Sequence, residues 1–168
     1  MSHKSKTPPQ VQRGSRNMKH FNVFPKTLYR LQNSKKINLR AWTPEIAEAL
    51  KSYDFITHSD GLIHPISGDF FSKPNGMSLR PIGVSLMNIA KSYDFKWVYV
   101  LKEGISIPNN LVLVHEYSDH YSLQTTEPCS ITDFNDRLNE FIKDQPTLSC
   151  EEFKKLLIEN SKNKMGKN

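Results

Sequence analysis

Turn-forming residues crowd one stretch of this chain, residues 60–81. Its sequence, DGLIHPISGDFFSKPNGMSLRP, contains three of the seven glycines and three of the ten prolines. Its Asp-Gly, Ser-Gly and Asn-Gly pairs are turn signals, because glycine adopts a positive φ without steric cost. A backbone that turns this often is either shaped for close approach to a ligand or forms a long surface loop. The elements on both sides must fold around it.

The end of this stretch is predicted to leave the turns and become extended. Its Asn-Gly pair gives a turn, and residues 77–81 then read as a short strand. Ser78 and Arg80 are two residues apart, so their side chains share one face of that strand. A hydroxyl and a guanidinium placed in this way suit a phosphate-bearing ligand.

Composition predicts a globular intracellular protein. The 168 residues fit one ordinary domain, and 37% of them are hydrophobic and 24% charged. No apolar run approaches the roughly 20 residues of a membrane-spanning helix, and we expect neither a membrane span nor a secretory signal. Cys129 and Cys150 lack the spacing of metal ligands, so we expect reduced thiols. The expected location is the cytoplasm, with mitochondria as the alternative.

Positive charge is concentrated at the start of the chain. The net charge is +6, yet residues 1–44 contain ten lysines and arginines and no acidic residue. Three interpretations of this segment stay open: a solvated tail, a nucleic-acid-binding arm and a mitochondrial presequence. We predict a disordered basic tail over residues 1–19, a folded domain over residues 20–160 and a second basic tail over residues 161–168.

Short β-type runs predict most of the strands. They are residues 20–24, 27–31, 55–58, 96–101, 111–117 and 121–126. Arg30 shares one face of its run with Leu28 and is expected to be partly buried. A partly buried guanidinium needs an anionic partner, so we expect Arg30 to contact an anion.

Helix signals lie between and after these runs. Thr-Pro-Glu at residues 43–45 predicts a helix that runs to about Ser52. Further helices are predicted after residue 81, after the cap Ser130 and after Ser149, which forms a capping box with Glu152. Strands and helices neither alternate strictly nor separate fully. This favours an α+β fold with an antiparallel or mixed sheet.

Several common catalytic sites are not supported by the sequence. The histidines show no metal-ligand spacing, although His58 and His64 flank the glycine-rich stretch and could meet in space. There is no G-x-S-x-G nucleophile elbow, no P-loop and no G-x-G-x-x-G motif.

Three polar residues on three predicted strands remain: Arg30 in TLYR, Ser78 in NGMSLRP and Gln124 in YSLQTT. Together with DGL-x-x-P and EGISIPNNL, these pieces follow the order and gaps of a known family. Over roughly residues 26–142 the chain resembles the bacterial type VI secretion toxins with an ADP-ribosyltransferase-like fold, which have relatives in fungi.

This resemblance implies a split β-sheet with flanking helices that holds NAD in a cleft. The implied activity is mono-ADP-ribosyl transfer from NAD to an acceptor macromolecule, without a metal. It also implies a neutralising partner protein. The reaction breaks the bond between nicotinamide and ribose through an oxocarbenium-like state, which the protein must stabilise.

The resemblance also implies a role for each residue. Arg30 would contact phosphate or ribose, Ser78 would be the strand hydroxyl at the nicotinamide end, and Gln124 would occupy the third motif. The secondary candidates for ring stacking or phosphate contact are Tyr29, Arg80 and Tyr121.

The third motif departs from that of better-known ADP-ribosyltransferases. They carry a glutamate there, whereas Gln124 is neutral and can only form hydrogen bonds. The carboxylates that could substitute are Glu116, Asp119 and Glu127. Two other interpretations stay open: a degenerate relative that binds NAD without turnover, and a non-catalytic nucleic-acid or organelle-associated protein that binds through its basic N-terminal segment.

Overall fold

A computed structural model describes residues 12–13, 18–49, 53–65, 71–72 and 76–165. Most of the predicted N-terminal tail and parts of the glycine-rich stretch lie outside these residues. The helices are α1 (Pro44–Glu48), α2 (Val84–Ser92), α3 (Ile131–Ile142) and α4 (Cys150–Met165). The strands are β1 (Gln12–Arg13), β2 (Lys19–Phe21), β3 (Leu28–Gln32), β4 (Phe71–Ser72), β5 (Met77–Leu79), β6 (Trp97–Leu101), β7 (Leu111–Tyr117), β8 (His120–Thr125) and β9 (Thr147–Ser149).

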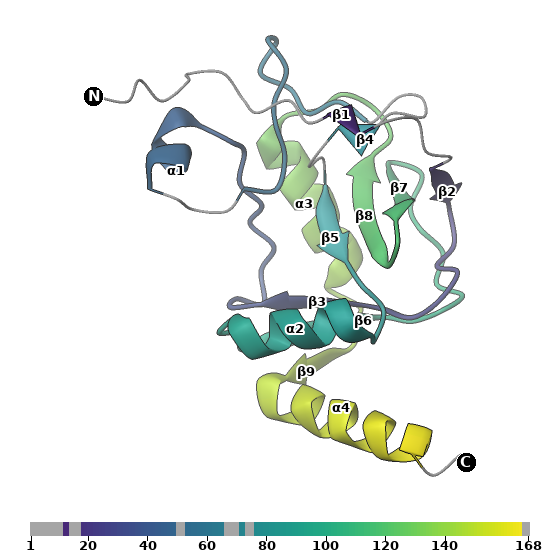
Figure 1. The fold of residues 1–168 in the computed structure, drawn as a ribbon. Helices are drawn as coiled ribbons and strands as arrows, with labels where there is room; N and C mark the ends of the chain where they lie inside the picture. The colour runs from purple at the N-terminus through teal and green to yellow at the C-terminus, as the bar shows by residue number, and fades with distance from the viewer. Residues whose placement is uncertain (1–11, 14–17, 50–52, 66–70, 73–75, 166–168) are drawn as a thin grey trace.

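Two antiparallel sheets and flanking helices form the described part of the chain, which confirms the α+β fold (Figure 1). One sheet has the order β2-β7-β8-β5 and the other β3-β6-β9. A short ribbon of β1 and β4 accompanies them.

The four-stranded sheet buries one face against α3. Its inward side chains include Met77 and Leu123, and the helix contributes Phe134 and Leu138 to the same core, with 0% of each residue exposed. The alternation of a strand turns every second residue to the opposite face. On β8 the opposite face is therefore polar.

The three-stranded sheet has its own core. Val98 on β6 packs with Leu86 of α2 and Phe153 of α4, and all three are buried. The apolar residues of α2 and α4 recur at helical spacing, and both helices bury them in this one cluster with Val98.

The two sheets meet where β3 approaches β5. Tyr29 N–H donates to the Arg80 carbonyl at 2.8 Å, and Arg80 N–H donates to the Tyr29 carbonyl at 3.2 Å. This bridge brings Arg30 next to Ser78, although 48 positions separate them in sequence. Figure 1 shows β3 and β5 approaching each other at the boundary between the sheets.

Most predicted elements are confirmed, and two are wrong in detail. The helix after Thr43 ends at Glu48 and buries no residue, so it is shorter than expected. The predicted strand at residues 55–58 does not form; Phe55 makes only a single parallel bridge to Ala41. Phe55 is instead held by its fully buried ring, which packs edge-on against Phe134 at 5.9 Å. One deeply buried ring does not require a regular strand around it.

Candidate functional site

A cavity of about 540 Å³ opens beside the junction of β3 and β5. Ligand sites of proteins have volumes of about 300–1,000 Å³. Its lining comes from β3, the segment after it, β5 and α2, and comprises Tyr29, Arg30, Leu31, Gln32, Asn33, Ser34, Lys36, Asn38, Arg40, Asp54, Ser78, Leu79, Arg80, Leu86, Ile89 and Tyr93. Four of the six sequence-predicted site residues are in this set.

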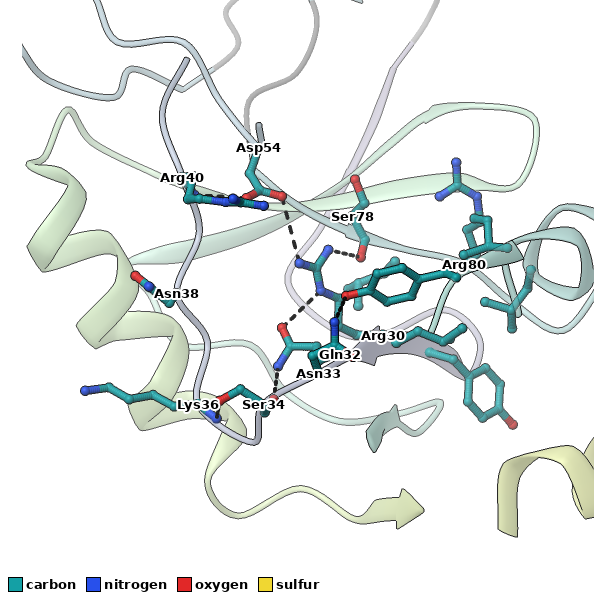
Figure 2. Close-up of a pocket in the computed structure, with 16 residues that line it drawn as sticks. Arg30, Gln32, Asn33, Ser34, Lys36, Asn38, Arg40, Asp54, Ser78 and Arg80 are labelled. Atoms are coloured by element: carbon teal, nitrogen blue, oxygen red, sulfur yellow. Dashed lines mark hydrogen bonds and ion pairs between the residues drawn. The ribbon is translucent and has the colours of Figure 1, made fainter. Parts of the chain in front are cut away.

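Arg30 is fixed in place by three groups (Figure 2). Its Nη1 donates to the Ser78 carbonyl at 3.3 Å, its Nε donates to Gln32 Oε1 at 3.2 Å, and its Nη2 lies 3.8 Å from Asp54 Oδ1. The side chain is 19% exposed. Burial lowers the pKa of the Arg30 guanidinium, whereas the charge of Asp54 raises it. Asp54 is the anionic partner that the sequence predicted for Arg30, and a guanidinium stays charged in this setting.

The cavity lining is electropositive. Its charged side chains are Arg30, Lys36, Arg40 and Arg80, against the single carboxylate of Asp54. Arg80 Nε is buried and has no hydrogen-bond partner among the residues described. Figure 2 shows the Arg80 guanidinium apart from that of Arg30, so the two cations do not converge on one point. A lining of this kind favours a ligand with more than one negative group.

Helix α3 holds one wall of the cavity. Asn139 Oδ1 accepts from Ile37 N–H at 2.7 Å, and its Nδ2 donates to the Ile37 carbonyl at 2.8 Å. Asn135 makes the same pair of bonds with Leu39, at 2.8 and 3.2 Å. Ile37 and Leu39 point into the core, so the alternate residues of the extended segment 36–40 face the cavity. These residues are Lys36, Asn38 and Arg40.

The hydroxyl of Ser78 belongs to a second group of polar side chains. Figure 2 shows the Ser78 carbonyl toward Arg30 and the hydroxyl pointing away from it. The hydroxyl lies 3.2 Å from His120 Nε2, and His120 Nδ1 lies 2.7 Å from Glu116 Oε2. Glu116 Oε1 accepts from Ser122 Oγ at 2.6 Å. Gln124 Nε2 donates to Ser122 Oγ at 2.8 Å and to Glu116 Oε1 at 3.4 Å.

Ser78 therefore connects two sets of polar groups. Its carbonyl is bonded to Arg30, and its hydroxyl begins the hydrogen-bonded series that ends at Gln124. Gln124 is 1% exposed and does not line the cavity. Tyr121 does not line it either, because it lies on the other face of β8, is 4% exposed and stacks on His115 at 4.3 Å. Tyr29 lines the cavity and packs against Phe153 with ring centroids 5.6 Å apart.

Glu116 is the one of the three candidate carboxylates that contacts Gln124 and the His120 ring. Asp119 lies in the turn between β7 and β8, and Glu127 is exposed beyond β8. The position of Glu116 follows from a β-bulge. His115 pairs with Tyr121 and Tyr117 pairs with His120, which leaves Glu116 as the extra residue.

Sequence reasoning missed His120 as a site residue. The available signal was its place at the start of β8, two and four residues before Ser122 and Gln124, since this spacing puts all three on one face. The bulge that adds Glu116 to that face gives no comparable signal in the sequence. His58 and His64 do meet, with ring centroids 4.0 Å apart. Within the described residues, no cluster of three or more His, Cys, Asp or Glu could hold a metal ion.

Comparison with known proteins gives one match. The family model described as Tse2 ADP-ribosyltransferase toxin matches residues 26–149, which include β3, β5, β8 and all lining residues of the cavity. No curated protein and no solved structure matches the chain. The helices of the described part include none that is long and apolar enough to cross a membrane. Because the match spans well over half of the chain, the protein belongs to the Tse2 ADP-ribosyltransferase toxin family.

Proposed function

We propose that this protein is a mono-ADP-ribosyltransferase that binds NAD in the cavity beside Arg30 and transfers ADP-ribose to a macromolecule of a target cell. The observation that carries the proposal is that Arg30 and Ser78 meet at one cavity. They come from different sheets, are joined by a hydrogen bond of 3.3 Å, and line one electropositive cavity. ADP-ribosyltransferases use NAD, and family membership makes NAD the first ligand to test.

The cavity chemistry suits the two ends of NAD differently. Arg30 and the cations around it would hold the pyrophosphate, because a guanidinium forms paired, charge-assisted bonds to phosphate oxygens. The rim supplies Tyr93, which is 41% exposed and lies beside apolar Ile89. An exposed aromatic ring at a cavity edge suits stacking on a heterocyclic base. Ser78 would then face the glycosidic bond, at the end of the polar chain that leads to Gln124.

The test is nicotinamide release from NAD by the purified full chain. We expect Arg30→Ala to weaken NAD binding by about 10- to 100-fold, since charge-assisted hydrogen bonds contribute about 1.5–3 kcal/mol. Ser78→Ala should lower turnover while NAD still binds. Lys102→Ala is the control, because this lysine is exposed and lies outside the cavity lining. Binding of NAD by folded Arg30→Ala with unchanged affinity would contradict the proposed site.

A specific observation also supports NAD binding without turnover. Gln124 is neutral, nearly fully buried and directed at Ser122 and Glu116, so it does not place a charge in the cavity. A binding-only protein would be stabilised by NAD, by about 2.7 kcal/mol at a hundredfold excess over the dissociation constant, and would release no nicotinamide. Calorimetry and product analysis on the same sample distinguish the two functions.

The family also implies a target and raises the prospect of a protein that neutralises the toxin. We propose that a neutralising protein would cover the cavity, because its lining offers four cations to an acidic partner surface. The chemical class of the acceptor is a matter for product analysis with labelled NAD.

A further inference from the structure

A hydroxyl, an imidazole and a carboxylate lie in series, beginning at Ser78 of the cavity lining. Ser78 Oγ is 3.2 Å from His120 Nε2, and His120 Nδ1 is 2.7 Å from Glu116 Oε2. Glu116 and His120 come from one hairpin, β7 and β8, and the fold adds Ser78 from β5. This order of groups is the one in which a carboxylate orients an imidazole that removes a proton from a hydroxyl.

Hydrogen bonding decides which nitrogen of His120 carries a proton. Glu116 is 3% exposed, and its Oε1 already accepts from Ser122 Oγ at 2.6 Å. The carboxylate Oε2 accepts from His120, so Nδ1 is the donor. In the neutral ring Nε2 is then an acceptor and faces the Ser78 hydroxyl. When the ring gains a second proton, the buried carboxylate compensates the new charge.

The groups around the His120 ring come from β7, from the turn before β8 and from β5. From β7 come Glu116 and Tyr117, whose ring stacks on the imidazole at 5.2 Å between centroids. Asp119 precedes His120 in the turn, and β5 contributes Ser78. Arg30, one of the cations of the cavity lining, is bonded to the Ser78 carbonyl and not to its hydroxyl. Ser78, which lines the cavity and contacts His120 through its hydroxyl, is therefore the residue that links the two.

We propose that Ser78, His120 and Glu116 form a proton relay that takes up the proton released by the nucleophile attacking NAD. This inference rests on the proposed function. Gln124 cannot take up this proton, because an amide neither gains nor loses a proton near neutral pH. Its bonds to Ser122 and Glu116 make it a positioning residue for the carboxylate.

In the proposed step one bond to the anomeric carbon breaks, another forms and one proton moves to His120. The bond between the nicotinamide nitrogen and the anomeric carbon breaks, and its electron pair leaves with nicotinamide. The acceptor oxygen or nitrogen, or water in hydrolysis, forms the new bond to that carbon. The acceptor proton passes to Ser78 Oγ while the Ser78 proton passes to His120 Nε2. The resulting imidazolium is paired with Glu116 and later returns the proton to solvent.

The first arm of the test is the pH profile of nicotinamide release at saturating NAD. A base accepts a proton only in its unprotonated form, so a rate that depends on the relay should rise with pH. We expect His120→Gln, which cannot take up a proton, to lower the rate at least 100-fold and to flatten this rise, while the NAD dissociation constant changes less than threefold. Ser78→Thr keeps a hydroxyl and should retain most of the rate that Ser78→Ala loses.

His115→Gln is the matched control. This histidine is on the same hairpin, but its ring stacks on Tyr121 and its Nε2 lies 2.6 Å from the Ser118 carbonyl. It should keep both the rate and the pH profile. A wild-type rate and profile in folded His120→Gln would overturn the relay and leave the proposed function intact. A loss confined to NAD affinity would also overturn it.

The second arm needs no NAD and separates the relay from the proposed function. A fluorophosphonate reagent modifies a serine whose proton is taken up by a base. We expect it to label Ser78 of the free protein, with at least tenfold slower labelling in His120→Gln. If the native chain releases no nicotinamide, this labelling would show that the activated hydroxyl exists although the proposed function fails. Equal labelling of native protein and His120→Gln, or none of either, would overturn the relay.

Discussion

Ser78 is the residue at which the two polar groups of the site meet. Its carbonyl accepts from Arg30, and its hydroxyl contacts His120. Its position depends on Gly76, which lies against β8. A Cβ on Gly76 would be 2.5 Å from the Leu123 carbonyl oxygen and 3.0 Å from Gln124 Cγ. Only glycine allows the start of β5 to approach β8 this closely.

Gly76→Ala should therefore destabilise the protein by about 2–3 kcal/mol, the upper part of the range for overpacking, because the obstructing atom is backbone. Urea unfolding followed by fluorescence measures the change. Gly83→Ala is the control: its Cβ would meet only Asp119 Oδ2 at 3.7 Å, and its φ of 177° suits any residue. It should cost less than about 1 kcal/mol, through the weaker helix N-cap. Equal effects of the two changes would contradict the close approach.

At the scale of elements, the cavity wall depends on a helix that does not contact the cavity itself. Asn135 and Asn139 are four residues apart on α3 and bind alternate residues of the segment 36–40. Two residues four positions apart on a helix are separated by about the same distance as two residues two positions apart on an extended segment. Asn135 and Asn139 can therefore each reach one of the two inward residues of the segment. This arrangement fixes Lys36 and Arg40 on the cavity side.

Asn139→Ala should lower the free energy of unfolding by about 2–4 kcal/mol, since it leaves the Ile37 N–H and carbonyl without partners. It should also weaken NAD binding, because the segment bearing Lys36 is no longer held. Asn88→Ala on the exposed face of α2 is the matched control and should change neither quantity. The measurements are urea unfolding and calorimetric NAD titration. Unchanged stability of Asn139→Ala would contradict the role of the asparagine pair.

The capping box that begins α4 gives a pH-dependent prediction. Glu152 Oε1 accepts from Ser149 N–H at 3.1 Å, and Glu152 N–H donates to Ser149 Oγ at 3.1 Å. The bond from the Ser149 backbone, with that from its side chain, lowers the pKa of the Glu152 carboxyl. Because the pKa of this carboxyl is lower in the folded state, its ionised form stabilises the protein at pH values above the pKa of the unfolded state. This stabilisation is lost as the pH falls through the pKa of the folded state.

The difference in unfolding free energy between the native chain and Glu152→Gln should therefore be present at pH 7 and shrink as the pH falls below about 4. Ser149→Ala should cost about 1 kcal/mol at pH 7. Glu151→Gln, which changes the neighbouring exposed carboxylate, tests whether the effect is specific. Thermal unfolding across the pH range provides the values. A pH-independent difference for Glu152→Gln would show that its charge plays no part.

At the scale of the whole molecule, the sequence predicted the elements better than their meeting points. The strands at residues 111–117 and the helix after Ser130 were predictable, because apolar residues recur there at the period of each element. The strand β9 was not predicted, since three half-buried residues carry too little pattern. The pairing of β3 with β5 is a tertiary contact that periodicity does not encode.

For the candidate site, individual residues could be singled out from the sequence, but not the contacts between them. Arg30 and Ser78 could be singled out from strand alternation and family resemblance, and the structure places both on one cavity. Their connection to Gln124 depends on His120, which strand alternation places on one face with Gln124, and on the bulge at Glu116, which leaves no local pattern. Cavity residues such as Asp54 and Lys36 lie outside the strands and helices that the sequence predicted. Long-range packing, not local propensity, assembles these parts.

The matched family region ends at residue 149, yet the helix that follows supports the site. Phe153 of α4 is fully buried and packs against Tyr29 at 5.6 Å and Phe95 at 6.0 Å. Tyr29 lines the cavity, and its backbone forms the bridge to Arg80. Loss of the Phe153 ring would therefore loosen the junction from behind. α4 is a structural part of the site although it contributes no lining residue.

Phe153→Ala should destabilise the protein by about 3–5 kcal/mol, the usual cost of removing a buried aromatic ring. At temperatures where the variant is still folded, NAD binding should also weaken, because Tyr29 loses the ring that holds it. Ile158→Ala on the same helix, at a side chain that is 55% exposed, should change stability by less than about 0.5 kcal/mol and leave binding unchanged. Thermal unfolding and calorimetry test both effects. Full NAD affinity in folded Phe153→Ala would show that the helix stabilises its own sheet only, and that the β3–β5 junction keeps its geometry without support from α4.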